Sequence, residues 1–501
     1  MKNDAVCGEV GQSVADAAGR GVSEVAGSRL GRRNFLKGLL VAGGGAAMCP
    51  AILPGTLMAA DKSGKNGPAA NELDYPVKEL ACKTSRPITV AIMGAGSRGG
   101  VYAMYAERFP DAMKVVAVAD LNEFRRKKMA ERHGIEADKV FGDCHDMLKA
   151  GRVADAMVIA LPDNLHYEPA MEAMKQGYDL LLEKPMAQTE QECLDLLKRQ
   201  RETGVIVGVC HVLRYAPYFQ ALKAAIDDGL IGDVVSVQHM EPIEYAHMCH
   251  SYVRGNWHCS KQTTPIILAK SCHDLDIIKW FLGNRKCEQV SAEGSLRVFR
   301  SENAPAGAPA RCTDGCPHEA TCPYSAIDIY CNKHKHMYVF DLPKGYKRED
   351  VMEKLRTTDY GRCVFHCDND QCDHYVTTLR FEGGVTASFA MEAFTPWGGR
   401  RTRVMGTKGF IEGDGKRFGL YDFRAGTKRS WAKNVAEVAG YRGSGHGGGD
   451  LALVRDFLMA VDRRDPSLLS SSLAASVESH VMGFACEKSR LTGQKVDVNV
   501  S

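Results

Sequence analysis

The chain has 501 residues, of which 45% are hydrophobic and 25% are charged, and its formal net charge is +3. This length allows two or three domains of ordinary globular composition. Because the net charge is small and no basic stripe is interleaved with aromatic residues, nucleic acid is not an expected partner.

Residues 1–60 have the pattern of an export signal. A mildly apolar run, residues 38–60, follows the motif Arg32-Arg33-Asn34-Phe35-Leu36-Lys37. This arrangement is typical of a twin-arginine signal, which sends a folded protein through the twin-arginine translocase to the periplasm. Pro50 and Pro54 interrupt the apolar run, so a permanent membrane helix is not expected. Residues 61–86 are polar and are predicted to be a linker.

The next segment predicts a dinucleotide site. An apolar strand from Ile88 leads into the loop Gly94-Ala95-Gly96-Ser97-Arg98-Gly99, and a second apolar run ends at Asp120. In this pattern the first glycine permits a tight turn, the second lets the backbone approach a pyrophosphate, and the third lets the helix pack on the strand. The diphosphate then lies at the helix N-terminus. Asp120 is placed to accept the hydroxyls of the adenosine ribose.

Alternating strands and helices continue to about residue 212. Strands are expected at 140–141, 153–160, 178–182 and 205–209, with helices at 166–177 and 188–203. This order predicts a doubly wound Rossmann domain over residues 87–212. Beyond it, strands at 234–240, 290–299, 375–381, 385–392 and 403–406 predict a large open, mostly antiparallel sheet. Helices are expected at 218–229, 449–463 and 472–491. The predicted fold is therefore α/β, with a Rossmann domain followed by an α+β domain over residues 213–501.

The motif Glu183-Lys184-Pro185 follows one of the predicted parallel strands. Ligands bind at that edge of a doubly wound sheet, so Lys184 is placed to reach a hydroxyl on the nicotinamide face. The alternative is an ordinary surface lysine before a helix. Pro185 is a candidate for a cis peptide bond that aims the lysine.

Together these motifs resemble the glucose–fructose oxidoreductase/inositol dehydrogenase (Gfo/Idh/MocA) family. The resemblance covers roughly residues 87–490 and rests on the glycine loop, Asp120, the loop Leu161–His166, Glu183-Lys184-Pro185 and the segment Ser271–Asp276. It implies NAD or NADP, hydride transfer on sugars, cyclitols or glycosides, and a homo-oligomer. Similar exported members hold their cofactor tightly.

Carried over by position, the resemblance implies a set of site residues. Lys184 would bond the reacting hydroxyl, and His273 would act as general acid/base, unless it only caps the helix that follows. The implied substrate contacts are Tyr215, Arg254, Trp257 and His273. The implied cofactor contacts are Gly94, Gly96, Ser97, Arg98, Gly99, Asp120, Leu161, Pro162, Asn164, His166, Glu183, Lys184 and Arg214.

One position departs from the family pattern. The polyol dehydrogenases carry an aspartate four residues before the histidine, whereas this chain has Ala269 there, with Lys270 beside it. Lys270 is therefore a further catalytic candidate, because two nearby lysines depress each other's pKa. Alternatively, Lys270 binds an anionic substrate such as a uronate. The proton path stays open.

The choice between NAD and NADP depends on charge near the ribose. Asp120 favours NAD because an acid repels a 2′-phosphate, whereas Arg125 and Arg126 would accommodate NADP. Downstream, Asp274 and Asp276 fall in the first turn of a helix, where acids have a structural role. Asp450 is expected to cap the helix that follows a glycine-rich loop containing His446.

The cysteines are concentrated in an insert over residues 300–372. Thiols at the spacing of Cys312, Cys316, Cys322 and Cys331 fit one structural zinc ion. Disulfide bonds, which export would permit, remain an alternative, as do free buried thiols and an iron–sulfur cluster.

The leading hypothesis is an exported NAD(P)-dependent oxidoreductase that acts on a hydroxyl carbon of a carbohydrate. One alternative is a glycoside hydrolase or lyase that oxidises transiently, eliminates the aglycone and returns the hydride. Another is a non-catalytic binding protein on the same fold, against which Lys184 and His273 argue.

Overall fold

The computed structural model describes residues 71–499. The predicted signal and the first part of the predicted linker lie outside this range. Within it, no helix has both the length and the apolar character needed to cross a membrane.

The N-terminal half forms a six-stranded, fully parallel sheet. The spatial order is β3-β2-β1-β4-β5-β6. The strands are β1 (Ile88–Met93), β2 (Met113–Ala119), β3 (Val140–Phe141), β4 (Ala156–Ile159), β5 (Asp179–Leu182) and β6 (Val207–Val209). The predicted doubly wound Rossmann sheet is confirmed. Its order reverses between β1 and β4, and in such sheets this switch point opens the crevice that binds nucleotides.

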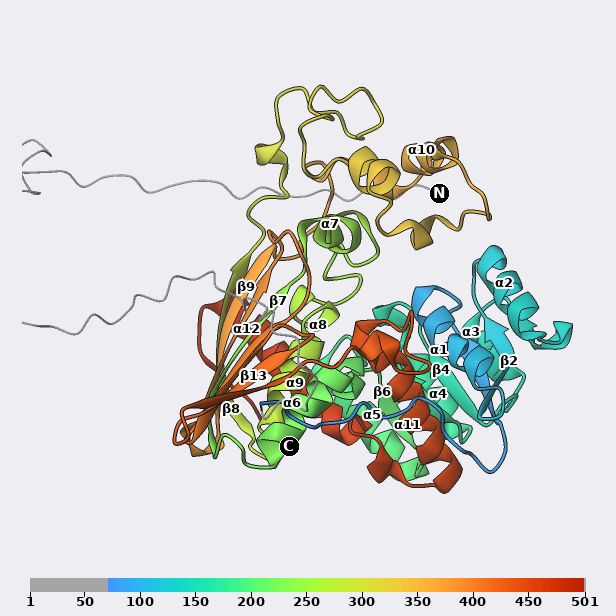
Figure 1. The fold of residues 1–501 in the computed structure, drawn as a ribbon. Helices are drawn as coiled ribbons and strands as arrows, with labels where there is room; N and C mark the ends of the chain where they lie inside the picture. Colours follow the sequence, from blue (N-terminus) through green and yellow to red (C-terminus); the bar gives the residue numbers. More distant parts are fainter. Residues whose placement is uncertain (1–70, 500–501) are drawn as a thin grey trace, which may run out of the picture. The chain divides into compact units, whose positions relative to one another are not determined.

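Helices cover the parallel sheet because its central strands are apolar on both faces. They are α1 (Ser97–Arg108), α2 (Glu123–His133), α3 (Cys144–Lys149), α4 (Tyr167–Lys175) and α5 (Glu190–Thr203). A late helix, α11 (Gly449–Arg463), returns to this half and packs against α1 (Figure 1). The C-terminal part of the chain thus also packs against the parallel sheet of the N-terminal half. One apolar core contains residues from both halves.

The C-terminal half contains a nine-stranded sheet of order β14-β13-β12-β11-β7-β10-β9-β8-β15. Its strands are β7 (Val234–Pro242), β8 (Cys287–Ser295), β9 (His374–Phe381), β10 (Thr386–Glu392), β11 (Arg401–Gly406), β12 (Gly409–Gly413), β13 (Phe418–Asp422), β14 (Thr427–Trp431) and β15 (Val496–Asp497). Only the β7–β10 pair is parallel. The predicted open, mostly antiparallel sheet is confirmed, although β12 to β15 were not expected.

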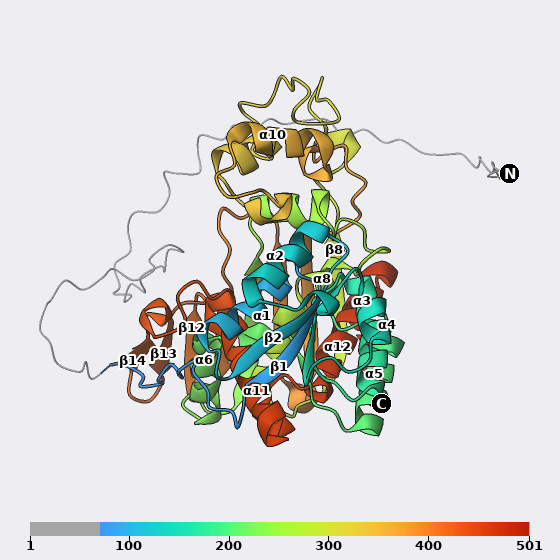
Figure 2. The same cartoon turned by 90° about the vertical axis from the view of Figure 1, so that its right-hand side faces the viewer.

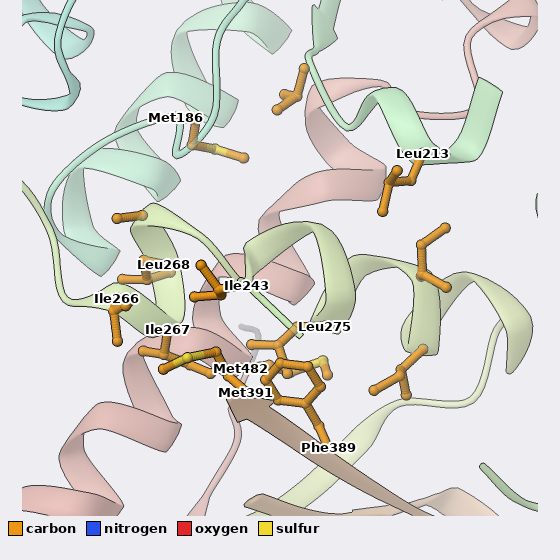
Figure 3. Packing of buried hydrophobic residues seen from close by; sticks show 14 of the residues in the cluster. Met186, Leu213, Ile243, Ile266, Ile267, Leu268, Leu275, Phe389, Met391 and Met482 are labelled. Atoms are coloured by element: carbon orange, nitrogen blue, oxygen red, sulfur yellow. The ribbon is translucent and has the colours of Figure 1, made fainter. Parts of the chain in front are cut away.

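Helices α9 and α12 pack on one face of this sheet, and the main core lies beneath them (Figure 1). Figure 3 shows Leu275 of α9 and Met482 of α12 against Phe389 and Met391 of β10. The helices of this half are α6 (Pro217–Asp227), α7 (Tyr245–Met248), α8 (Ile266–Ala269), α9 (Cys272–Phe281), α10 (Arg348–Thr357) and α12 (Leu473–Thr492).

Residues 71–86 do not form a free linker, contrary to the prediction. Leu73 donates its backbone N–H to Ser430 of β14, and Trp431 donates its indole N–H to the carbonyl of Tyr75. Leu80 is fully buried. The linker was predicted because the segment is mostly polar, but its few apolar residues attach it to both halves of the protein.

The insert between β8 and β9 contains α10 and irregular turns. In Figures 1 and 2 it is coloured yellow to gold and lies next to α7. Arg254, just after α7, donates hydrogen bonds to the insert carbonyls of Arg362 (2.7 Å) and Tyr324 (2.7 Å). Arg254 thereby fastens the insert to the segment that follows α7.

Candidate functional site

The glycine loop between β1 and α1 has the backbone geometry that its sequence predicts. Gly94 has φ +89°, and a Cβ there would lie 2.4 Å from the carbonyl oxygen of Ala160. A Cβ on Gly99 would lie 1.9 Å from the carbonyl oxygen of Gly94. Only glycine fits either position. Ser97 opens α1, so the free N–H groups of that helix face the place expected for a diphosphate.

Asp120 lies at the end of β2, beside the glycine loop. Its carboxylate accepts the backbone N–H groups of Ala95 and Asn122, both at 2.7 Å. These bonds hold the carboxylate at the crevice, where it can receive ribose hydroxyls. The exposed loop residues Pro162 and Asn164, with half-buried Leu161, follow β4 across the same crevice. The residues present therefore fit a dinucleotide.

Arg98 and Glu183 have a different role from the predicted cofactor contacts. The Arg98 guanidinium pairs with Glu183 (2.6 Å) and with Asp450 (2.9 Å), and it also donates to the Tyr102 hydroxyl. Burial alone would raise the pKa of Glu183, but Arg98 and Lys184 outweigh it and the net shift is downward. This ion cluster joins the glycine loop to the end of β5 and to α11. It also explains why Asp450 does not cap its helix.

Lys184 projects from the end of β5 to the second half of the protein. Its Nζ donates to the carbonyl oxygen of Ala269 at 2.5 Å, and the Lys184–Pro185 bond is cis, as expected.

His166 connects the loop after β4 to the loop after β5. Each ring nitrogen of His166 lies within hydrogen-bond distance of a carbonyl, those of Pro185 (2.7 Å) and Leu161 (2.8 Å). His166 is thus a buried support for two loops.

His273 lies in the first turn of α9 and is 4% exposed. Burial, followed by the charge of Lys184, lowers its pKa well below the usual range. Its Nδ1 has no hydrogen-bond partner among the described residues. A neutral, unpartnered imidazole next to a lysine is the form that can accept a proton from a hydroxyl.

Lys270 belongs to a second buried ion cluster. Its Nζ lies 3.4 Å from Glu241, and Arg400 bridges Glu241 (2.7 Å) and Asp274 (2.8 Å). Burial lowers the pKa of Lys270, Arg400 lowers it further, and Lys184 adds a smaller effect in the same direction. The expected effect of Lys184 on the pKa of Lys270 is therefore present but minor. Glu241 compensates the positive charge of Lys270 that was predicted to bind an anionic substrate.

Several of the implied contacts have structural partners within the protein. Arg214 is buried and pairs with Asp276 at 2.6 Å, and the Tyr215 hydroxyl bonds to Ser471 at 2.9 Å. Arg254 is held by the insert. Long-range partners that no local pattern reveals bond to each of these side chains, although Nη1 of Arg254 has no hydrogen-bond partner among the described residues. Trp257 is half-buried and donates its indole N–H to Asp163 at 2.9 Å, so it joins the β4 loop to the second half.

Sequence reasoning undervalued a group of histidines around His273. The rings of His211 and His446 lie 5.9 Å and 5.7 Å from it, and His446 bonds to Asp450 at 2.9 Å. Farther out, His250 stacks on His336 of the insert at 4.3 Å. In the sequence, the dense run Lys333-His334-Lys335-His336 was the feature that could have indicated this group of histidines.

The zinc prediction for Cys312, Cys316, Cys322 and Cys331 is not supported. Among residues 71–499, no group of three or more histidine, cysteine or acidic side chains is arranged to hold a metal ion. Cys331 lies in a separate turn, and burial raises the pKa of the Cys322 and Cys331 thiols, which disfavours thiolate ligands. The described cysteines are all free thiols, so no disulfide replaces the metal.

Two family models match the chain. The NAD-binding Rossmann domain of the Gfo/Idh/MocA oxidoreductase family matches residues 88–211, and the C-terminal alpha/beta domain of the same family matches residues 223–498. The chain therefore belongs to the Gfo/Idh/MocA oxidoreductase family, and its first domain is an NAD-binding Rossmann domain.

Curated relatives agree with this assignment. The chain is 26% identical to Bacillus subtilis (strain 168) YteT over 380 residues, covering 71% of this chain and 84% of YteT. It is 32% identical to inositol 2-dehydrogenase from Rubrobacter xylanophilus over 218 residues, covering 42% of this chain. That match spans only 56% of the Rubrobacter protein.

Solved structures share the fold. An inositol dehydrogenase homologue from Azotobacter vinelandii, complexed with NADH and myo-inositol, has a TM-score of 0.60 at 15% identity and covers 84% of this chain and 100% of its own. An Agrobacterium radiobacter oxidoreductase in complex with NAD+, L-tartaric acid and magnesium also has a TM-score of 0.60, at 16% identity, and covers 82% of this chain and 98% of its own.

The buried histidines predict loss of stability in acid. Burial, followed by His211, lowers the pKa of His480 to about 3, while its Nε2 accepts the Met186 N–H. Below a pH of about 6.5, His480 is protonated in the unfolded chain, whereas it stays neutral in the folded chain until the pH approaches its lowered pKa. The free energy of unfolding should then fall by about 1.4 kcal/mol per pH unit for each such histidine.

Urea unfolding at a series of pH values measures this slope. His480→Gln, whose amide can replace the bonds to the Met186 N–H and to the Ser476 carbonyl oxygen, should reduce the slope by one proton. His145→Asn, at an exposed position, should leave it unchanged. An identical slope in wild type and His480→Gln would contradict the assignment.

Proposed function

We propose that the protein is an NAD-dependent oxidoreductase that removes a hydride from a hydroxyl carbon of a sugar, cyclitol or glycoside. The observation that carries this proposal is the placement of Lys184 and His273 together at the carboxyl edge of the parallel sheet, next to the glycine loop. This substrate class is supported by the inositol 2-dehydrogenases among the relatives and by the similar Azotobacter structure, which is a complex with NADH and myo-inositol.

The chain's own residues divide the proton chemistry. Bound NAD+ would supply the hydride acceptor. Lys184 donates a hydrogen bond that orients the reacting hydroxyl, in place of its present bond to Ala269. His273, kept neutral by burial, takes the hydroxyl proton. Because Lys270 is compensated by Glu241, it positions the segment before α9 rather than carrying the proton itself.

Substitution of either residue should remove turnover without unfolding the protein. Lys184→Met and His273→Asn are each expected to lower kcat by about 100-fold or more, the usual size of general acid–base catalysis. The assay incubates the purified protein with a panel of sugars, cyclitols and aryl glycosides and follows NADH absorbance, with and without added NAD+. Lys198→Met and His145→Asn, at exposed positions on α5 and α3, are the matched controls. Full activity in Lys184→Met would show that the site is wrongly placed.

A second candidate function is glycoside cleavage with no net redox change. Elimination next to a transient ketone needs an additional acid or base for the leaving group. His446 answers this need: its side chain is 31% exposed, it bonds to the buried Asp450, and its ring lies 5.7 Å from that of His273.

Aglycone release separates the two candidates. If cleavage is the activity, aryl glycosides should release their aglycone without net NADH, and His446→Asn should slow that release by about 100-fold. The same variant should still reduce the bound cofactor, because the first hydride step does not need His446. Stoichiometric NADH with no aglycone in the wild type would reject cleavage and leave the dehydrogenase.

We also propose export through the twin-arginine translocase to the periplasm, on the basis of Arg32 and Arg33. The double substitution Arg32→Lys with Arg33→Lys should move the protein from the periplasmic to the cytoplasmic fraction, as measured by immunoblot. Arg20→Lys, upstream of the motif, is the control. Unchanged fractionation of the double variant would reject this route.

A further inference from the structure

The edge of the nucleotide crevice that would receive the 2′ position of the ribose carries two arginines. Arg125 and Arg126 follow Asp120 on the first turns of α2. Arg126 turns back and donates to the carbonyl oxygens of Asp120 and Leu121, each at 3.2 Å. Of the two arginines, Arg125 is therefore the one whose guanidinium is placed to bind a 2′-phosphate. Its Nη1 lies 3.8 Å from the place of a Cβ on Gly96, at the mouth of the glycine loop.

A carboxylate from the insert occupies Arg125. Asp341 accepts the Arg125 Nε–H at 3.0 Å and lies 2.9 Å from Nη2. It also accepts the side-chain amide of Asn122 at 3.1 Å. Asn122 and Arg125 both belong to the segment that follows β2, so the insert contacts the edge of the crevice expected to receive the ribose. Asp341 adds a second acid beside Asp120.

The insert holds Asp341 in place from both sides. Phe340 is 2% exposed and packs on Tyr330 and Tyr360, with ring centroids 5.1 Å and 5.6 Å away. Asp341 itself has φ +49°, a conformation that L-residues seldom adopt. At the other end of the segment, Lys335 pairs with Glu244, next to α7. The carboxylate is thus presented by a fixed backbone.

We propose that Asp341 selects NAD over NADP by neutralising Arg125. This inference rests on the proposed function, because it requires a nicotinamide dinucleotide in the crevice. With Asp341 present, the charge of Arg125 is compensated, and the Asp120 carboxylate beside it repels a 2′-phosphate. Without Asp341, Arg125 is free to make the charge-assisted hydrogen bonds that arginine forms with phosphate.

The test is equilibrium binding of NAD+ and NADP+ to the full chain freed of bound nucleotide. Wild type should prefer NAD+. Asp341→Asn should tighten NADP+ binding by about tenfold, the value of one charge-assisted hydrogen bond, with little change for NAD+. Asp341→Gly provides a second variant, because glycine accepts the positive φ without strain. Adding Arg125→Ala to Asp341→Asn should abolish the gain.

The matched control is Glu349→Gln, which removes the same charge from an exposed position of the insert. If the Asp341 variants weaken both nucleotides equally, or leave the ratio of dissociation constants unchanged, Asp341 only fastens the insert and the inference is overturned. In either case the NAD-dependent function survives. If the wild-type chain binds neither nucleotide, the proposed function and this inference fail together.

Discussion

The arrangement of the site depends on one half-buried guanidinium that two buried carboxylates hold. Arg98 lies in the first turn of α1, at the glycine loop, yet its partners are Glu183 at the end of β5 and Asp450 at the start of α11. Removing Arg98 would leave the buried carboxylates of Glu183 and Asp450 without their shared cation, which costs several kcal/mol. The cluster therefore fixes the position of Lys184, which follows Glu183, relative to the nucleotide loop. Through Asp450 it also positions His446.

A second ion cluster performs the same task on the other side of the site. Arg400 from the edge of β11 joins Glu241 of β7 to Asp274 of α9, and His239 completes the set at 3.0 Å from Asp274. These bonds hold the first turn of α9 against the sheet. His273 lies between the two clusters, and its own Nδ1 is left without a partner in the described part of the chain. The two clusters pair their own charges, and His273 shares the space between them with His211, whose ring nitrogens also lack hydrogen-bond partners among the described residues.

The sequence was sufficient for the parts of the fold that depend on local periodicity. Apolar runs and glycine spacing predicted the Rossmann strands, and they predicted the crevice with Asp120 and Lys184. The short strands β12 to β15 were missed because they are brief and gain stability by pairing with neighbours. Residues 71–86 were misread because isolated anchors such as Leu80 carry no periodic signal. The partners of Arg214 and Arg254 were not foreseen because a charged side chain next to a motif does not reveal its partner.

The sequence by itself determined the class of chemistry, because a glycine loop, an acid after the second strand and a lysine after a later strand must meet at one edge of a parallel sheet. Only the tertiary structure determined which charged side chains are paired within the protein and which are free to bind a ligand. Asp341 and Arg125 are 216 positions apart, and Arg98 and Asp450 are 352 apart. No local pattern links such residues. The folded chain pairs them because a charge removed from water must find an opposite charge.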